Sequence, residues 1–253
     1  MEVENTITGE LKVSTLPRLI VRILFAGVIL TVGFLCLVAL NAGAPEVAMV
    51  KMVVGLIVLW IVLGGALMYH FRDQVREFIQ SLPFDWRVKF VLFATMLALI
   101  EEMITVLMTN LAPSFGVKPG EAYITASANY LDVVLFHSVV VFVPLFIAWA
   151  ILLSRYDFSP FSVFLLFGLT GIVCEMTISP AGAVLGSAMW IFIYGLMVYL
   201  PAYCIPTERS ARTAKWYHYL LVIPATFLIA MPLLLPIVYF VTQVLQHPPG
   251  AHF

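Results

Sequence analysis

Charged side chains are scarce in this chain. Its 253 residues include 13 Lys or Arg and 14 Asp or Glu, so 11% are charged, against about 25% in an ordinary soluble domain. The formal net charge of -1 supplies no basic field, which excludes nucleic acid as a partner. The chain is 62% hydrophobic, a composition typical of an integral membrane protein whose main partner is the lipid bilayer.

Cysteine is also rare, and recognisable metal motifs are missing. Cys36, Cys174 and Cys204 lie in or beside apolar segments without CxxC spacing, which argues against a disulfide framework or a structural zinc site. Neither HExxH nor ExxH occurs, so ligand spacing marks no metal site. Soluble-domain linkers and internal repeats are not evident either, and we predict a single transmembrane domain over residues 1–253.

Long apolar segments are what the sequence has in quantity. Seven of them approach the length of about 20 residues that a helix needs to cross a bilayer core. The first is too long for the apolar core of a signal peptide and is expected to remain as a span. We therefore predict an all-α, multi-pass bundle of about seven transmembrane helices. The expected spans are 19–42, 47–69, 87–110, 130–153, 160–178, 183–204 and 217–244.

Lysine and arginine predict the orientation of these spans. Eleven of the 13 basic residues fall on one side of the predicted membrane, and only Lys51 and Lys118 fall on the other. Because cytoplasmic loops carry an excess of Lys and Arg, we expect a cytoplasmic N-terminus and an extracytoplasmic C-terminus. Between the second and third spans, apolar residues at helical spacing alternate with charged ones, which predicts an amphipathic surface helix over about 70–82.

Ionisable residues inside the predicted spans are the candidate site. Glu101 and Glu102 lie in the third span, His137 in the fourth and Glu175 in the fifth. At 1.5 Å per residue, Glu101 and Glu175 are each roughly 21 to 22 Å from the cytoplasmic start of their spans. His137 is roughly 10 Å below the opposite surface. We therefore expect the four residues at one level near the extracytoplasmic side, and buried ionisable groups in a membrane are a functional hypothesis by default.

The other ionisable residues near this level have an ordinary structural explanation. Asp132 and Lys51 lie slightly closer to the outer surface, where hydration or structural pairing accounts for them as well as function does. We expect four further histidines, at span ends or in the tail, to be structural or solvated: His70, His218, His247 and His252. A buried glutamate can likewise be protonated and donate one structural hydrogen bond.

Carboxylates and an imidazole together suit hydrolysis. We predict a membrane-embedded hydrolase that acts on a membrane-partitioned substrate, a lipid-linked molecule or a transmembrane peptide, with Glu101, Glu102 and His137 as catalytic residues. The same three residues with Glu175 are the expected ligands if a divalent metal such as zinc, manganese or iron takes part. Without metal, one glutamate serves as general base and His137 as its partner acid.

One short motif resembles a known family. The Glu101-Glu102 pair followed by a membrane histidine is similar to the pattern of the glutamic intramembrane proteases related to CAAX-processing enzymes. That pattern's arginine and phenylalanine fall here at Val106 and Val133, so the resemblance transfers no residue role.

Two other classes of function fit the same residues. A proton- or cation-coupled transporter also places Glu and His in the membrane and often has broken helices, as Pro224, Pro232 and Pro236 predict for the last span. A subunit of a larger membrane complex that binds a partner helix, pigment or lipid is the third class. The inner halves of the spans are almost purely apolar, which favours an enzyme over a conduit.

Overall fold

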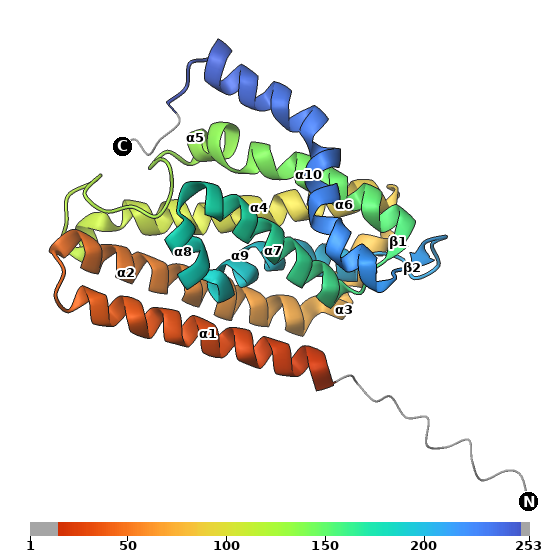
Figure 1. The fold of residues 1–253 in the computed structure, drawn as a ribbon, viewed down its shortest axis with the longest axis horizontal. Helices are drawn as coiled ribbons and strands as arrows, with labels where there is room; N and C mark the ends of the chain where they lie inside the picture. Colours follow the sequence, from red (N-terminus) through yellow and green to blue (C-terminus); the bar gives the residue numbers. More distant parts are fainter. Residues whose placement is uncertain (1–14, 249–253) are drawn as a thin grey trace, which may run out of the picture.

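The structure, a computed structural model, describes residues 15–248 and is all-α apart from one short strand pair. Lys12, one of the basic residues that predict the orientation, and His252 lie outside the described residues. The helices pack side by side into a bundle, with the two described ends of the chain at opposite ends of it (Figure 1). The elements in chain order are α1 (Thr15–Ala39), α2 (Ala44–Leu56), η1 (Ile57–Gly64), α3 (Gly65–Ser81), α4 (Trp86–Asn110), η2 (Ala112–Phe115), α5 (Tyr130–Asp132), η3 (Val133–His137), α6 (Val139–Arg155), β1 (Tyr156–Asp157), α7 (Pro160–Ile178), α8 (Pro180–Leu185), α9 (Ser187–Tyr203), β2 (Arg212–Thr213), α10 (Trp216–Tyr239) and η4 (Phe240–Val244).

Among the described residues, five helices are long and apolar enough to cross a membrane: Thr15–Ala39, Ala44–Ser81, Trp86–Asn110, Pro160–Ile178 and Trp216–Val244. A sixth is gained when Tyr130–His137 and Val139–Arg155, which meet at a 48° bend, count as one broken span. The chain is therefore a membrane protein by the length and composition of its helices. The predicted segment 183–204 corresponds to α8 and the 17-residue α9, so a count of seven stays a prediction.

The predicted surface helix over 70–82 falls within α3, which continues the helix before it. Ala44–Ser81 forms one helix of 38 residues, in which α2 passes through the π-helical stretch η1 into α3 without a break. Such a helix is about 57 Å long, nearly twice the roughly 30 Å hydrocarbon core. A helix of this length is long enough for the amphipathic residues of α3 to lie beyond the hydrocarbon, and their position at the membrane surface stays a prediction.

Helix α9 forms the centre of the bundle and packs closely on α7. A Cβ at Gly168 would lie 2.7 Å from the Ile191 Cα, and one at Gly195 would lie 2.6 Å from the Phe164 carbonyl oxygen. Both positions tolerate only glycine at this helix separation. The Trp60 indole N–H donates to the Ile193 carbonyl (3.1 Å) and ties η1 to the same central helix.

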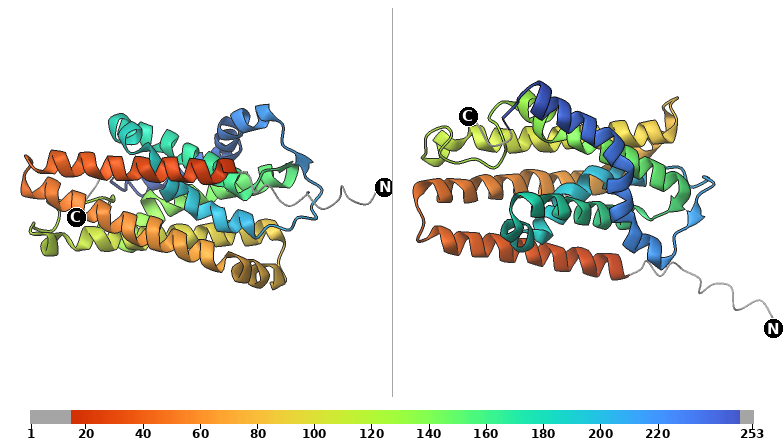
Figure 2. Two further views of the ribbon diagram at one scale, coloured as in Figure 1. Left: turned by 90° about the horizontal axis from the view of Figure 1, so that it is seen from below. Right: turned by 45° about the horizontal axis from the view of Figure 1, so that its top comes forward.

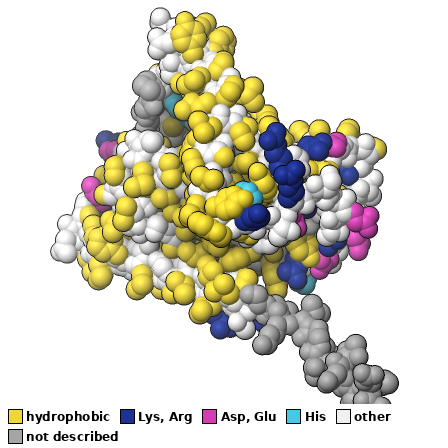
Figure 3. Space-filling model, turned by 45° about the vertical axis from the view of Figure 1, so that its right-hand side comes forward, with side chains coloured by type: hydrophobic (Ala, Val, Ile, Leu, Met, Phe, Trp, Pro, Cys, Tyr) yellow, Lys and Arg dark blue, Asp and Glu magenta, His cyan; other side chains and the backbone are white. Residues whose placement is uncertain are grey.

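The first and last helices lie on the outside of the bundle. Figure 2 shows α1 running along the outside beside α2, and hydrophobic side chains cover most of the face in Figure 3. Lys and Arg side chains gather toward one part of that face (Figure 3). The β1–β2 pair lies at the end of the bundle where α9 and α10 are joined, and Arg209 makes an ion pair there with Asp157. Apolar helix faces with charges confined to the ends are what a bilayer requires.

Candidate functional site

Glu101 and Glu102 lie inside the bundle on α4. Their exposed fractions are 5% and 7%, among the lowest of any charged residue in the described part of the chain. The Thr105 hydroxyl, one helical turn further on, donates to Glu101 Oε1 at 3.0 Å. The Ser138 side chain, at the start of α6, hydrogen-bonds to Glu102. Each buried carboxyl group thus has a hydroxyl partner, which offsets part of the cost of its burial.

Glu175 meets the same pair from α7. It lies close enough to Glu101 and Glu102 for their charges to interact, and the Tyr194 hydroxyl of α9 donates to its Oε1. Gly171, one turn before Glu175, leaves the room that the tyrosine ring needs, since a Cβ there would lie 2.0 Å from Tyr194 Cδ2. The structure therefore brings together three predicted site residues, Glu101, Glu102 and Glu175, which we call the carboxylate cluster.

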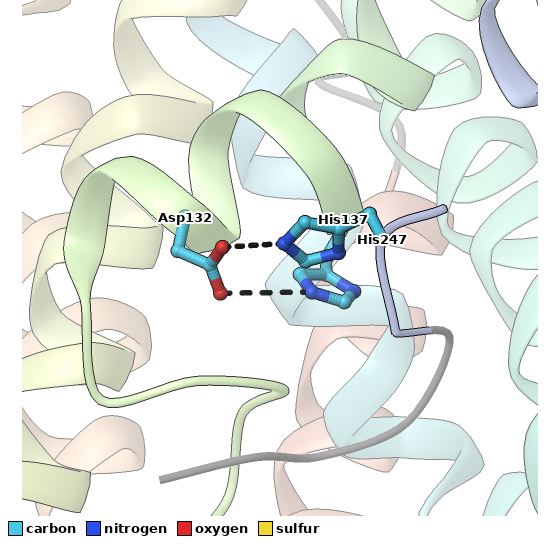
Figure 4. A group of neighbouring side chains, drawn as sticks. All are labelled: Asp132, His137 and His247. Atoms are coloured by element: carbon cyan, nitrogen blue, oxygen red, sulfur yellow. Dashed lines mark hydrogen bonds and ion pairs between the residues drawn. The ribbon is translucent and has the colours of Figure 1, made fainter. Parts of the chain in front are cut away.

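His137 points to a different set of partners. Its Nε2 lies 3.7 Å from Asp132 Oδ2, and its ring centroid lies 4.9 Å from that of His247. His247 Nε2 lies 2.7 Å from the other oxygen of the same carboxylate, Asp132 Oδ1. Figure 4 shows both imidazoles facing one carboxylate. We call these three residues the Asp-His-His triad; their side chains are 14%, 11% and 14% exposed in chain order.

Local backbone winding aligns Asp132 with His137. The Asn129 side chain caps the start of the helix, because it accepts hydrogen bonds from the backbone N–H groups of Leu131 and Asp132. The next five residues form the π-helical stretch η3, which closes with an i→i+5 hydrogen bond from Ser138 N to Val133 O at 3.0 Å. Because a π turn brings residues five apart onto one face, Asp132 and His137 lie side by side. A regular α-helix would rotate them about 140° apart.

A turn after the last helix delivers His247. Gln246 adopts a left-handed backbone conformation (φ 51°), which is uncommon for a residue other than glycine. The backbone N–H of His247 then donates to the Val241 carbonyl at 3.1 Å, so the chain folds back onto η4. The imidazole stacks on Phe136, with ring centroids 4.5 Å apart. The backbone hydrogen bond therefore holds the tail to η4, and the ring contact holds it against η3.

The donor atoms of the triad fit a divalent cation. All three ligand atoms lie within 4.8 Å of one another, and no other group of three His, Cys, Asp or Glu residues between 15 and 248 meets that test. Two ligand atoms that bind one metal tetrahedrally, with bonds of 2.0–2.1 Å, lie roughly 3.3 Å apart. To reach that separation, the 3.7 Å distance between His137 Nε2 and Asp132 Oδ2 would have to shorten by about 0.5 Å, and the 2.7 Å distance between His247 Nε2 and Asp132 Oδ1 would have to lengthen by about as much. Two imidazoles and one carboxylate also leave coordination positions open for water or substrate.

The hydrogen bonds of His247 agree with this role. Its Nδ1 lies 3.2 Å from the Pro248 carbonyl oxygen, which can only accept, so Nδ1 carries a hydrogen and donates. This contact directs Nε2 at Asp132 Oδ1, another acceptor, so a proton must lie between the two groups. A metal ion would replace that proton. Imidazoles that bind metals typically donate their second N–H to a carbonyl or carboxylate in this way.

The triad and the carboxylate cluster are neighbours. Ser138 directly follows His137 in the chain and contacts Glu102, so one residue joins the two groups. The triad shares only His137 with the predicted ligand set of Glu101, Glu102, His137 and Glu175. Lys51 is bound elsewhere, with its ammonium group 3.4 Å from the Phe115 carbonyl oxygen.

Sequence reasoning missed His247 and left Asp132 open. The i, i+5 spacing of Asp132 and His137 predicts that the two side chains share a face only if this stretch is wound as a π-helix. Nothing in the sequence indicates that the tail folds back and brings His247 to Asp132. Comparisons with protein-family models, curated proteins and solved structures gave no match. The function is therefore inferred from the geometry of the chain itself.

Proposed function

We propose that the chain is a membrane-embedded hydrolase that depends on a divalent metal held by Asp132, His137 and His247. The observation that carries the proposal is the convergence of two imidazoles on one carboxylate, at low exposure and next in the chain to Ser138, which contacts the buried Glu102. Zinc, iron(II) and manganese all accept this mixed nitrogen and oxygen donor set. Both the metal and the reaction are our inference from the donor set.

Each element of the triad has a distinct task in this proposal. The Asp132 carboxylate neutralises part of the cation charge, and the Pro248 carbonyl holds His247 in the tautomer that offers Nε2. When bound, the metal would lower the pKa of a coordinated water to about 7 and so supply hydroxide at neutral pH. In this proposal Glu102, which bonds to the Ser138 side chain next to His137 in the chain, accepts the proton that the water loses.

We infer that the site lies near one membrane surface. His137 and Asp132 lie at the start of the fourth predicted span, and His247 lies just past the last helix. With the orientation that Lys and Arg predict, this surface is extracytoplasmic. A substrate that partitions into the bilayer can reach such a site without leaving the membrane, which fits a protein whose helices are so apolar.

Oxygen labelling tests hydrolysis even when the substrate has not been identified. The purified protein is reconstituted with a membrane extract in water enriched in oxygen-18, with added zinc, and the products are analysed by mass spectrometry. A hydrolase transfers labelled oxygen into specific products, and Asp132→Asn abolishes this transfer. The matched control Asp157→Asn alters an ion pair at the opposite end of the bundle and should retain labelling. Equal labelling by native protein and Asp132→Asn would refute the proposal.

The carboxylate cluster favours one alternative, a proton-coupled transporter. Glu101, Glu102 and Glu175 share an interior site with Tyr194, an arrangement that transporters use to carry protons. In sealed vesicles loaded with a pH-sensitive dye, a transporter would move protons and Glu102→Gln would stop it. Proton movement that is independent of zinc and of Asp132 would support this alternative over the hydrolase.

A further inference from the structure

A groove adjoins the Asp-His-His triad. It is a half-open cavity of about 200 Å³ between α6 and the end of the α10–η4 helix. His137 and His247 form one end together with Thr242. The remaining walls are apolar and comprise Phe136, Val140, Val141, Ile237, Val238 and Val241 with Pro248.

The bent course of α10 leaves space for this groove. The helix crosses α6, and its second half runs in a different direction from the first (Figure 1). Pro232 and Pro236 lie inside that half, and each removes a backbone hydrogen bond and pushes against the preceding turn. The tail then returns at His247 and closes one end. The groove is thus bounded by a proline-bent helix, the broken α5–η3–α6 span and the triad.

One wall of the groove is formed by an exposed, apolar helix. Val238, on its wall, is 43% exposed, and its neighbours Leu235 and Phe240 are 60% and 52% exposed. These residues lie on a helix that is long and apolar enough to span the membrane. An occupant can therefore enter sideways from the bilayer, and it meets polar groups only when it reaches the triad.

We infer that the groove binds one hydrocarbon chain of an anionic lipid, with the polar junction of that lipid at the metal centre. The inference rests on the proposed function and names its substrate class. A smaller apolar cavity, of about 150 Å³, stays dry and binds benzene, which shows that apolar walls alone suffice to hold a hydrocarbon. The groove supplies this kind of wall along most of its length.

The same walls disfavour a transmembrane peptide. An unwound peptide in the hydrocarbon region needs a partner for every backbone N–H and C=O, and each unsatisfied group costs several kcal/mol. The groove offers side-chain partners only at its triad end, at His137, Thr242 and His247. A hydrocarbon chain makes no such demand.

The metal centre selects the polar end. A divalent cation held by one carboxylate and two neutral imidazoles keeps open coordination positions, and the oxygens of a phosphate or carboxylate group are suitable ligands for them. The groove has apolar walls along most of its length and the proposed metal ion at its triad end. An anionic lipid has the same sequence of groups, a hydrocarbon chain followed by a negatively charged head.

Photolabelling of the full chain tests the inference. The probe is palmitic acid with a diazirine in the middle of its chain, added to zinc-loaded protein in detergent and then illuminated. Labelled peptides should map to the start of α6 and the 237–242 region, and excess oleate should remove the label. Val140→Trp fills the groove and should lower labelling at least fivefold while zinc content stays unchanged. Val238→Trp is a second variant that should block the groove. Val238 is exposed, so the larger side chain does not have to fit into the packed core.

The matched control is Val58→Trp, a lipid-exposed valine on η1 away from the groove. It should leave labelling unchanged. Labelling that is spread over all exposed helices, or that neither blocking variant reduces in folded protein, would overturn the groove as a lipid site. Zinc binding without groove labelling would overturn this inference alone. Groove labelling in protein that binds no metal would overturn the metal-dependent hydrolase, and with it the position of the polar junction at a metal, while the binding of the hydrocarbon chain would stand.

Discussion

Metal binding should raise the thermal stability of the folded chain, and His247→Ala should remove the effect. A ligand that binds only the folded state at 100 times its dissociation constant stabilises by about 2.7 kcal/mol. For a chain of 150–250 residues, about 2–4 °C is gained per kcal/mol. We therefore expect the midpoint of unfolding to rise by roughly 5–11 °C when zinc is added at that concentration.

His247 supplies one of the three ligand atoms, so its loss should weaken metal binding by at least about 100-fold. At the same zinc concentration the remaining stabilisation is only about 0.4 kcal/mol, or roughly 1 °C. The assay is thermal unfolding in detergent, followed by tryptophan fluorescence, with zinc or with chelator. The comparison uses the change caused by zinc, so a general loss of stability in the variant does not affect it.

His218→Ala is the matched control for this experiment. His218 lies at the opposite end of the chain's last span, where its Nδ1 accepts the Lys215 backbone N–H at 2.8 Å. The control can lower the midpoint but should keep the full response to zinc. The reasoning fails if His247→Ala responds to zinc as strongly as the native chain, or if neither zinc, manganese nor iron(II) stabilises the native chain.

Three further predictions concern the interior of the bundle. Gly168→Ala places a methyl group against α9 backbone and should lower the free energy of unfolding by about 1–3 kcal/mol, whereas Gly33→Ala, with nothing within 4 Å, should not destabilise the chain in the same thermal assay. Tyr194→Phe removes the hydroxyl that donates to Glu175 and should cost about 1–3 kcal/mol while metal content stays constant; a loss of metal would show that the two groups are one site. Glu102→Gln should abolish oxygen-18 transfer and retain zinc, and loss of zinc in this variant would instead support Glu102 as a ligand.

The helices and the carboxylate cluster follow from regular geometry. Apolar length places the spans, and a constant rise per residue places Glu101 and Glu175 at matching depths on helices that run in the same direction. The glycine spacing on α7 indicates the close contact with α9. These features depend on local periodicity, which a sequence displays directly.

The triad depends on departures from that regularity. The π turn of η3 changes which residues share a face, and it turns Asp132 and His137 toward each other. The left-handed Gln246 returns the tail, and no sequence pattern there requires it. The break at Gly186 likewise divides the predicted segment 183–204 into α8 and α9. Tertiary packing selects these conformations, so local propensity does not predict them.

Metal content tests the central claim most directly. The protein is purified without chelator, exposed to zinc and desalted, and its metal is quantified beside two double variants that elute as folded species. The account predicts about one ion per native chain, none in Asp132→Asn/His247→Ala, and an unchanged amount in the control Asp157→Asn/His218→Ala. A native chain without metal, or a triad variant that keeps the ion, would contradict the account.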